Sequence, residues 1–301
     1  MKGLLILILM FSLFKSNSQD FFFGEYEKPD LLQKLEEYQN IRGQTWEWLG
    51  FYIEYDHHHS MTPLDVIPFA GTGGDGIHFG FLTDFGTVKD LSNAPIVCVS
   101  PSNDPPIRLV AQNLTDFLGL VLTIGEAEFL DDDYTSDEQI KAQLQEWDEV
   151  SEVDWKGNPL PKTEIEEMKQ RRAERRQGRV LLAKVLSEQF EIYPITKVSQ
   201  YINDLRVVRK KEITIETLDG IGIKYRTEKL IIEGFDYSVE DNLVQSYLDK
   251  ASEAERLKFY RDATYNYILS DDFDKVIKEL LIKSLQKHGY RREGQILKKK
   301  Y

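Results

Sequence analysis

Cysteine is almost absent from this chain of 301 residues, since Cys98 is the only one. A single cysteine excludes an internal disulfide and any zinc site built from cysteines. Cys98 lies in the apolar run "PIVCV", which favours a small buried hydrophobic residue over a reactive thiol. The cysteine count does not decide between an oxidising and a reducing compartment.

Positive charge is also scarce. The chain has 38 Lys and Arg against 51 Asp and Glu, which gives a net charge of -13. The summed field of such a chain repels phosphate backbones, so nucleic acid is not an expected ligand. A basic protein partner fits this charge balance better.

The charges are not evenly spread along the chain. Residues 131–154 are strongly acidic, and residues 169–179, "KQRRAERRQGR", are strongly basic. The basic block lacks the interleaved aromatic residues of surfaces that bind single-stranded nucleic acid. We therefore expect two solvated helices, with the acidic and basic faces pairing with each other.

Signatures of catalysis are missing as well. There is no G-x-S-x-G elbow, no context for a reactive cysteine and no acid pair with a distinctive spacing, so we expect neither enzyme activity nor a cofactor. The stretch "GTGGDGIHFGFLTDFG", residues 71–86, does hold a G-x-G-x-x-G and a D-F-G. A dinucleotide fingerprint needs a helix after its glycines, and a kinase D-F-G lies far beyond its glycine loop. Here a strand pattern follows Gly76, and we interpret the glycines as a tight loop between two strands.

A histidine cluster leaves one catalytic alternative open. His57 and His59 would share one face of a strand, and Asp75 or His78 could complete a metal shell. That arrangement would suit a metal-dependent hydrolase. The favoured interpretation is a polar loop before Pro63, with no metal bound.

The first 18 residues differ from the rest. One lysine precedes an apolar core over 4–14, and Ser16 and Ser18 follow in a small-x-small arrangement. The core is too short to cross a bilayer as a helix, and we expect no integral membrane span anywhere in the chain. We interpret 1–18 as a signal peptide, which favours export. The alternative is an unusual N-terminal extension of a cytoplasmic protein.

The remaining patterns predict an α+β fold in two parts. Apolar alternation and turn residues predict a helix from Pro29, strands within 44–56, 63–69, 76–88 and 94–100, and a helix capped by Asn113. The pattern of residues 191–301 predicts a smaller α+β unit, with a hairpin over 212–225 and helices from about 241 and 271. No Gly/Ser-rich or Pro-rich linker separates the parts, so we expect them to pack together.

The segment 66–88, "VIPFAGTGGDGIHFGFLTDFGTV", resembles the SUKH superfamily, which includes a fungal cell-wall-synthesis regulator and many bacterial immunity proteins. The matching features are the stretch 67–70, the loop 73–75, the aromatic strand with Phe79 and Phe81, and the turn at Gly86. The stretch 94–106, "APIVCVSPSNDPP", and the helix after Asn113 follow in the order of that family. The resemblance covers 26–130 well and 131–190 loosely, and it does not reach 191–301.

The resemblance implies a domain over 26–190, with a mixed sheet flanked by helices, and a non-enzymatic role in binding another protein. In bacterial relatives the partner is often a toxin that the immunity protein neutralises, and a basic toxin would suit the acidic charge balance. We take Asp75, His78, Asp84 and Asp104 as candidate partner-binding residues. Local turn hydrogen bonding is the alternative role for these side chains. A structural part of an exported assembly, docked through 191–301, is a further alternative function.

Overall fold

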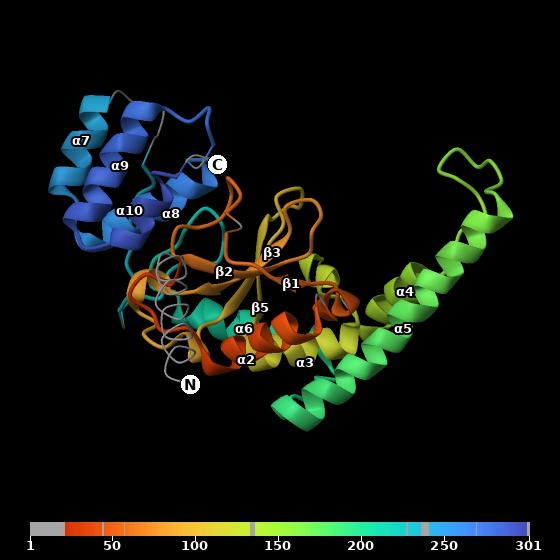
Figure 1. The fold of residues 1–301 in the computed structure, drawn as a ribbon. Coiled ribbons are helices and arrows are strands. Elements are labelled where there is room, and N and C mark those ends of the chain that lie inside the picture. Colours follow the sequence, from red (N-terminus) through yellow and green to blue (C-terminus); the bar gives the residue numbers. More distant parts are fainter. Residues whose placement is uncertain are drawn as a thin grey trace, which may run out of the picture.

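The computed structural model describes residues 22–299 except 44, 57, 133–135, 227, 236–240 and 269. The predicted signal peptide, residues 1–18, and His57 lie outside the described residues. Figure 1 shows a central sheet with helices packed on it, a pair of helices projecting to one side, and a group of short helices at the opposite side.

The sheet confirms the predicted α+β class. Within the described residues, five strands pair in sequence order: β1 (Tyr52–Ile53), β2 (Val66–Gly71), β3 (His78–Leu82), β4 (Ile96–Val99) and β5 (Ile107–Ala111). Every pairing is antiparallel, which corrects the mixed sheet that we expected. The short connections 72–77, between β2 and β3, and 100–106, between β4 and β5, allow only antiparallel pairing, because a parallel pair needs a long crossover connection.

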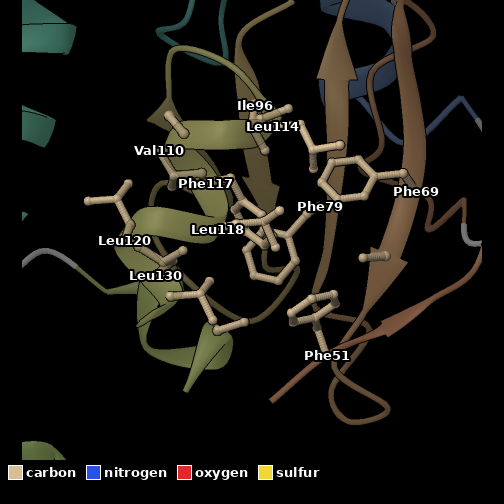
Figure 2. Close-up of a cluster of buried hydrophobic side chains, with 14 of the residues drawn as sticks. Phe51, Phe69, Phe79, Ile96, Val110, Leu114, Phe117, Leu118, Leu120 and Leu130 are labelled. Atoms are coloured by element: carbon tan, nitrogen blue, oxygen red, sulfur yellow. The ribbon is translucent and has the colours of Figure 1, made fainter. Parts of the chain in front are cut away.

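One face of the sheet packs against α3 (Leu114–Ile124), as Figure 2 shows. The Phe117 ring lies 4.8 Å from that of Phe79 and 5.5 Å from that of Phe69, measured between centroids. The predicted cap of this helix is confirmed, because the Asn113 side chain accepts a hydrogen bond from the N–H of Asp116 at 2.9 Å. The helix α2 (Asp30–Arg42), also predicted, contributes Leu32 and Leu35 to the same core.

The opposite face of the sheet is buried as well. Its side chains pack with Leu205 of α6 (Val198–Glu212) and with Ile221, and α6 lies along β5. The sheet residues of this second cluster are Val66, Leu82, Val97, Val99, Ile107 and Leu109. Residues beyond 191 therefore complete the burial of the N-terminal sheet.

The predicted strand over 44–56 is mostly wrong. Thr45–Leu49 forms a 3-10 helix, and only Tyr52–Ile53 pairs as a strand. The fully buried Trp46 donates its indole N–H to the Leu35 carbonyl at 3.1 Å, which holds the chain against α2. The alternation of aromatic residues here arises from this packing and not from a pleated strand.

The two charged segments form an arm, which we define as α4 (Asp137–Asp148), the loop 149–161 and α5 (Lys162–Phe190). The arm points away from the sheet in Figure 1. The predicted pairing of acidic and basic faces is confirmed by the ion pair between Arg179 and Asp148. At the base of the arm, Gly178 of α5 lies directly against the indole of Trp48.

The C-terminal module consists of α7 (Asp241–Lys250), α8 (Glu253–Tyr265), α9 (Lys275–Lys287) and α10 (Arg291–Ile296). The helices expected near 241 and 271 are present, and Asp274 caps α9 through the N–H groups of Val276 and Ile277. The expected hairpin over 212–225 is formed only in part: Ile215 and Ile223 pair antiparallel and exchange backbone hydrogen bonds at 3.1 and 2.9 Å, but no continuous strands extend from this pair. Only isolated bridges join Ile215 to Ile223 and to Leu230, since Gly220 and Gly222 have positive φ and interrupt the ladder.

The D-F-G stretch connects the sheet to the C-terminal module. Asp84 and Phe85 have φ values of 49° and 50°, and a residue with a side chain loses about 1–2 kcal/mol in this left-handed conformation. Two contacts offset that cost. The Phe85 ring packs 5.6 Å from that of Tyr290, and the Asp84 carboxylate accepts two hydrogen bonds from Arg209, at 2.6 and 2.7 Å.

Asp84 and Arg209 belong to a buried charge cluster, whose other members are Asp65, Asp219 and Arg261. Arg261 is fully buried and bonds both Asp65, at 2.7 Å, and Asp219, at 2.5 Å. Burial raises the pKa of Asp65 to about 6, with Arg261 opposing the rise and the other two carboxylates adding to it. The cluster joins strand-end residues to α6 and α8, so it fixes the C-terminal module against the sheet.

Candidate partner-binding surface

The loop between β2 and β3 is the tight glycine loop that the sequence predicts. The Thr72 N–H bonds the Ile77 carbonyl at 3.1 Å, and the Ile77 N–H bonds the Gly74 carbonyl at 3.0 Å. Asp75 sits at the tip with φ of 50° and is exposed. The loop therefore carries one acidic side chain outward on a well-defined backbone.

Further carboxylates gather beside this loop. Asp131 accepts hydrogen bonds from Ser100, at 3.3 Å, and from the Asn103 amide, at 3.1 Å. These bonds join the end of the short helix Ala127–Asp131 to the loop that carries Asp104. We call the resulting surface the acidic rim, and its members are Asp75, Asp104, Glu128, Asp131 and Asp132.

Carboxylates of the acidic rim perturb one another. Partial burial is the main cause of the raised pKa of Glu128, and repulsion from Asp131 and Asp75 raises this pKa further. Burial also raises the pKa of Asp131, against the hydrogen bonds from Ser100 and Asn103 that lower it. A cationic group brought to the rim would relieve this repulsion, so the surface is suited to Lys and Arg side chains of a partner.

Two of the four predicted site residues are not on this surface. His78 is fully buried, with its Nδ1 2.7 Å from the Gly76 carbonyl oxygen and its Nε2 2.9 Å from the Thr62 hydroxyl. Asp84 is 1% exposed and bonds Arg209. Since both side chains are internal, they cannot contact a docked protein, and only Asp75 and Asp104 remain exposed candidates.

The arrangement of histidines does not assemble a metal centre in the described ranges. No three His, Cys, Asp or Glu side chains lie close enough together there to hold a metal ion. His59 contacts the Ser60 hydroxyl at 3.1 Å, and both ring nitrogens of His78 have partners. His57, the other proposed ligand, lies outside the described residues.

A buried ion pair close to the rim was not anticipated. Glu126 has no exposed surface and receives two hydrogen bonds from Arg175 of α5, at 2.6 and 3.0 Å. Burial raises the pKa of Glu126 to about 7 even though Arg175 opposes the rise. The pair ties the arm to the segment that carries Glu128. Glu126 and Arg175 are 49 residues apart, so no local pattern in the sequence indicates this pair. The sequence indicated only that the acidic and basic segments would pair in general.

No helix in the described part of the chain is long and apolar enough to cross a membrane. Compared with known proteins, the sequence matches no family model and has no significant match to a curated protein.

Proposed function

We propose that this chain is a non-enzymatic protein-binding module that uses the acidic rim to hold a basic protein partner. The observation that carries the proposal is the gathering of carboxylates at the rim, where Ser100 and Asn103 hold Asp131, and where repulsion from Asp131 and Asp75 adds to the rise in the pKa of Glu128 that burial mainly causes. Lys or Arg side chains of a partner would relieve that repulsion, which makes the free energy of binding more favourable. Long-range electrostatic attraction would also raise the association rate.

The net charge of -13 supports the same class of partner, because the whole molecule attracts basic proteins. The SUKH resemblance of residues 66–88 supports a toxin domain as the partner, neutralised when its active site is covered. A regulatory partner of similar charge is the alternative within this proposal.

The test is co-purification of the full chain with a basic toxin-like domain encoded beside it. The rim variant would carry Asp75→Asn, Asp104→Asn and Glu128→Gln, which removes three negative charges from the rim. A control variant would carry Glu164→Gln, Glu166→Gln and Glu167→Gln, which removes the same charge from an exposed part of α5.

Wild type and control should retain the partner, whereas the rim variant should bind it with an association rate lower by about tenfold at low salt. The difference should shrink as salt is added, because exposed charges are screened. Equal retention by all three proteins would refute the role of the rim. Failure to find any basic partner would refute the function itself.

A further inference from the structure

The end of the arm that lies away from the sheet in Figure 1 carries a small hairpin, residues 151–160, which we call the tip hairpin. An antiparallel bridge joins Val153 to Pro159. The N–H of Asp154 bonds the Asn158 carbonyl at 2.8 Å, and the Asp154 carboxylate accepts hydrogen bonds from the backbone N–H and the side-chain amide of Asn158, at 2.8 and 2.9 Å. The backbone of the tip hairpin is therefore held by its own hydrogen bonds, although most of its surface is exposed.

The tip hairpin presents Trp155 to solvent. This side chain is 89% exposed, and Val153 beside it is 46% exposed. The Nζ of Lys156 lies over the Trp155 ring, 4.5 Å from its centroid. A tryptophan this exposed buries too little apolar area to stabilise the fold. On a well-held backbone it suits binding instead, because it offers a large apolar surface and has few rotamers to order.

The charges around Trp155 are mostly negative. The loop 149–161 has three acidic side chains and one basic side chain: Glu149, Glu152, Asp154 and Lys156. Hydrogen bonds from the side chain and backbone of Asn158 lower the pKa of Asp154, so this carboxylate is charged at neutral pH. An apolar ring among carboxylates fits an apolar pocket edged by Lys and Arg side chains, and it does not fit a surface of anionic lipids.

The tip hairpin lies within reach of a protein that is bound at the acidic rim. Glu128 of the rim lines a groove of about 350 Å³ together with Arg171 and Glu174 of α5, so the rim meets the side of that helix. From Arg171 to Lys162, the first residue of α5, the helix rises by about 14 Å, and the tip hairpin precedes Lys162 directly. A small domain is about 30 Å across, so one partner beside α5 can contact both surfaces.

We propose that Trp155 anchors the basic partner of the acidic rim by inserting its ring into an apolar pocket of that partner. This inference rests on the proposed function, because the same protein occupies both surfaces. The rim raises the association rate, since attraction between charges acts before contact. The ring lowers the dissociation rate, since apolar contacts form only in the docked complex. The two surfaces therefore control different rate constants of one interaction.

The test measures association and dissociation rates of the full chain on the immobilised basic partner that co-purifies with it. Trp155→Ala should raise the dissociation rate at least about tenfold and should change the association rate by less than about twofold. The matched control is Tyr193→Ala, because Tyr193 is also an exposed aromatic residue, at 66%, and lies just after the end of α5, outside the tip hairpin and the acidic rim. Both rates of the control should stay within about twofold of the wild type.

Fluorine NMR gives a direct readout of the ring. The chain has four tryptophans, so labelling with 5-fluorotryptophan gives four signals, and Trp155→Phe identifies that of Trp155. In the free chain this signal should shift between H₂O and D₂O, because the ring is exposed. Addition of the unlabelled partner should abolish that solvent dependence.

The possible results separate the anchor from the rim. Equal dissociation rates of Trp155→Ala and Tyr193→Ala, or a Trp155 signal that stays solvent-dependent in the complex, would overturn the anchor and leave the rim in place. Faster dissociation of Trp155→Ala, together with unchanged association of the rim variant, would support the anchor and refute the rim. Absence of any basic partner would overturn both.

Discussion

Replacing Gly178 with alanine sets two opposite effects against each other in the middle of α5. In a solvent-exposed helix the change would stabilise the protein by about 1 kcal/mol, because glycine is the poorer helix former. At Gly178, however, an added Cβ would lie 2.2 Å from Cδ2 and 2.4 Å from Cε3 of Trp48. The helix or the indole must therefore shift by about 1 Å, and forced shifts of this kind cost about 1–3 kcal/mol. We expect a net loss of stability of up to about 2 kcal/mol.

The sign of the effect should reverse when the indole is removed. In a Trp48→Ala background the three indole atoms that crowd the added Cβ are absent, and the same Gly178→Ala change should stabilise the protein by about 0.5–1 kcal/mol. Urea unfolding of the four proteins, followed by far-UV circular dichroism, should give a coupling energy of up to about 3 kcal/mol for the pair. Stabilisation by Gly178→Ala in both backgrounds would show that the arm does not rest on Trp48 in this way.

Four further results are expected. Glu126→Gln should change the pH dependence of stability. The pKa of Glu126 is about 7 in the folded state and 4.5 in the unfolded state. The wild type therefore loses stability as pH rises between these two values, by up to about 3 kcal/mol relative to the variant. Unfolding free energies at pH 5 and pH 8 measure this, and a pH-independent difference would contradict it. Asp84→Asn should cost about 3–5 kcal/mol in urea unfolding, because Arg209 would remain buried without its counter-ion. Asn113→Ala should lower the unfolding free energy by about 1 kcal/mol through loss of the α3 cap, and no change would show that another group satisfies the Asp116 N–H. Cys98 should react with a thiol reagent only as fast as the protein unfolds, because it is buried and burial raises its pKa; rapid labelling of folded protein would contradict this.

The sequence predicted those elements whose residues follow a simple local rule. The strands around Phe69, Phe79 and Cys98 were recognisable by their apolar residues and flanking turns, and the α3 cap by Asn113. Helix α8 was missed because its buried positions include Lys258, Arg261 and Asp262 among the apolar ones, and these charges hide the helical period.

The candidate site was predicted only in part, because burial depends on contacts between distant segments. The glycine loop and the exposure of Asp75 follow from local turn chemistry. Whether His78 and Asp84 face solvent depends on Thr62 and on Arg209, which is 125 residues further along the chain. No local pattern in the sequence contains that information.

The way in which α6 and Ile221 cover the second sheet face has a practical consequence for dividing this protein. A chain shortened to end at residue 190 would leave Val97, Val99 and Leu109 facing water. It would also leave the buried carboxylates of Asp65 and Asp84 without their ion-pair partners, Arg261 and Arg209. Such a fragment would aggregate or be degraded rather than behave as a smaller version of the whole. The two parts therefore fold as one unit, and insertions are best tolerated at the tip of the arm, where the loop 149–161 is largely exposed.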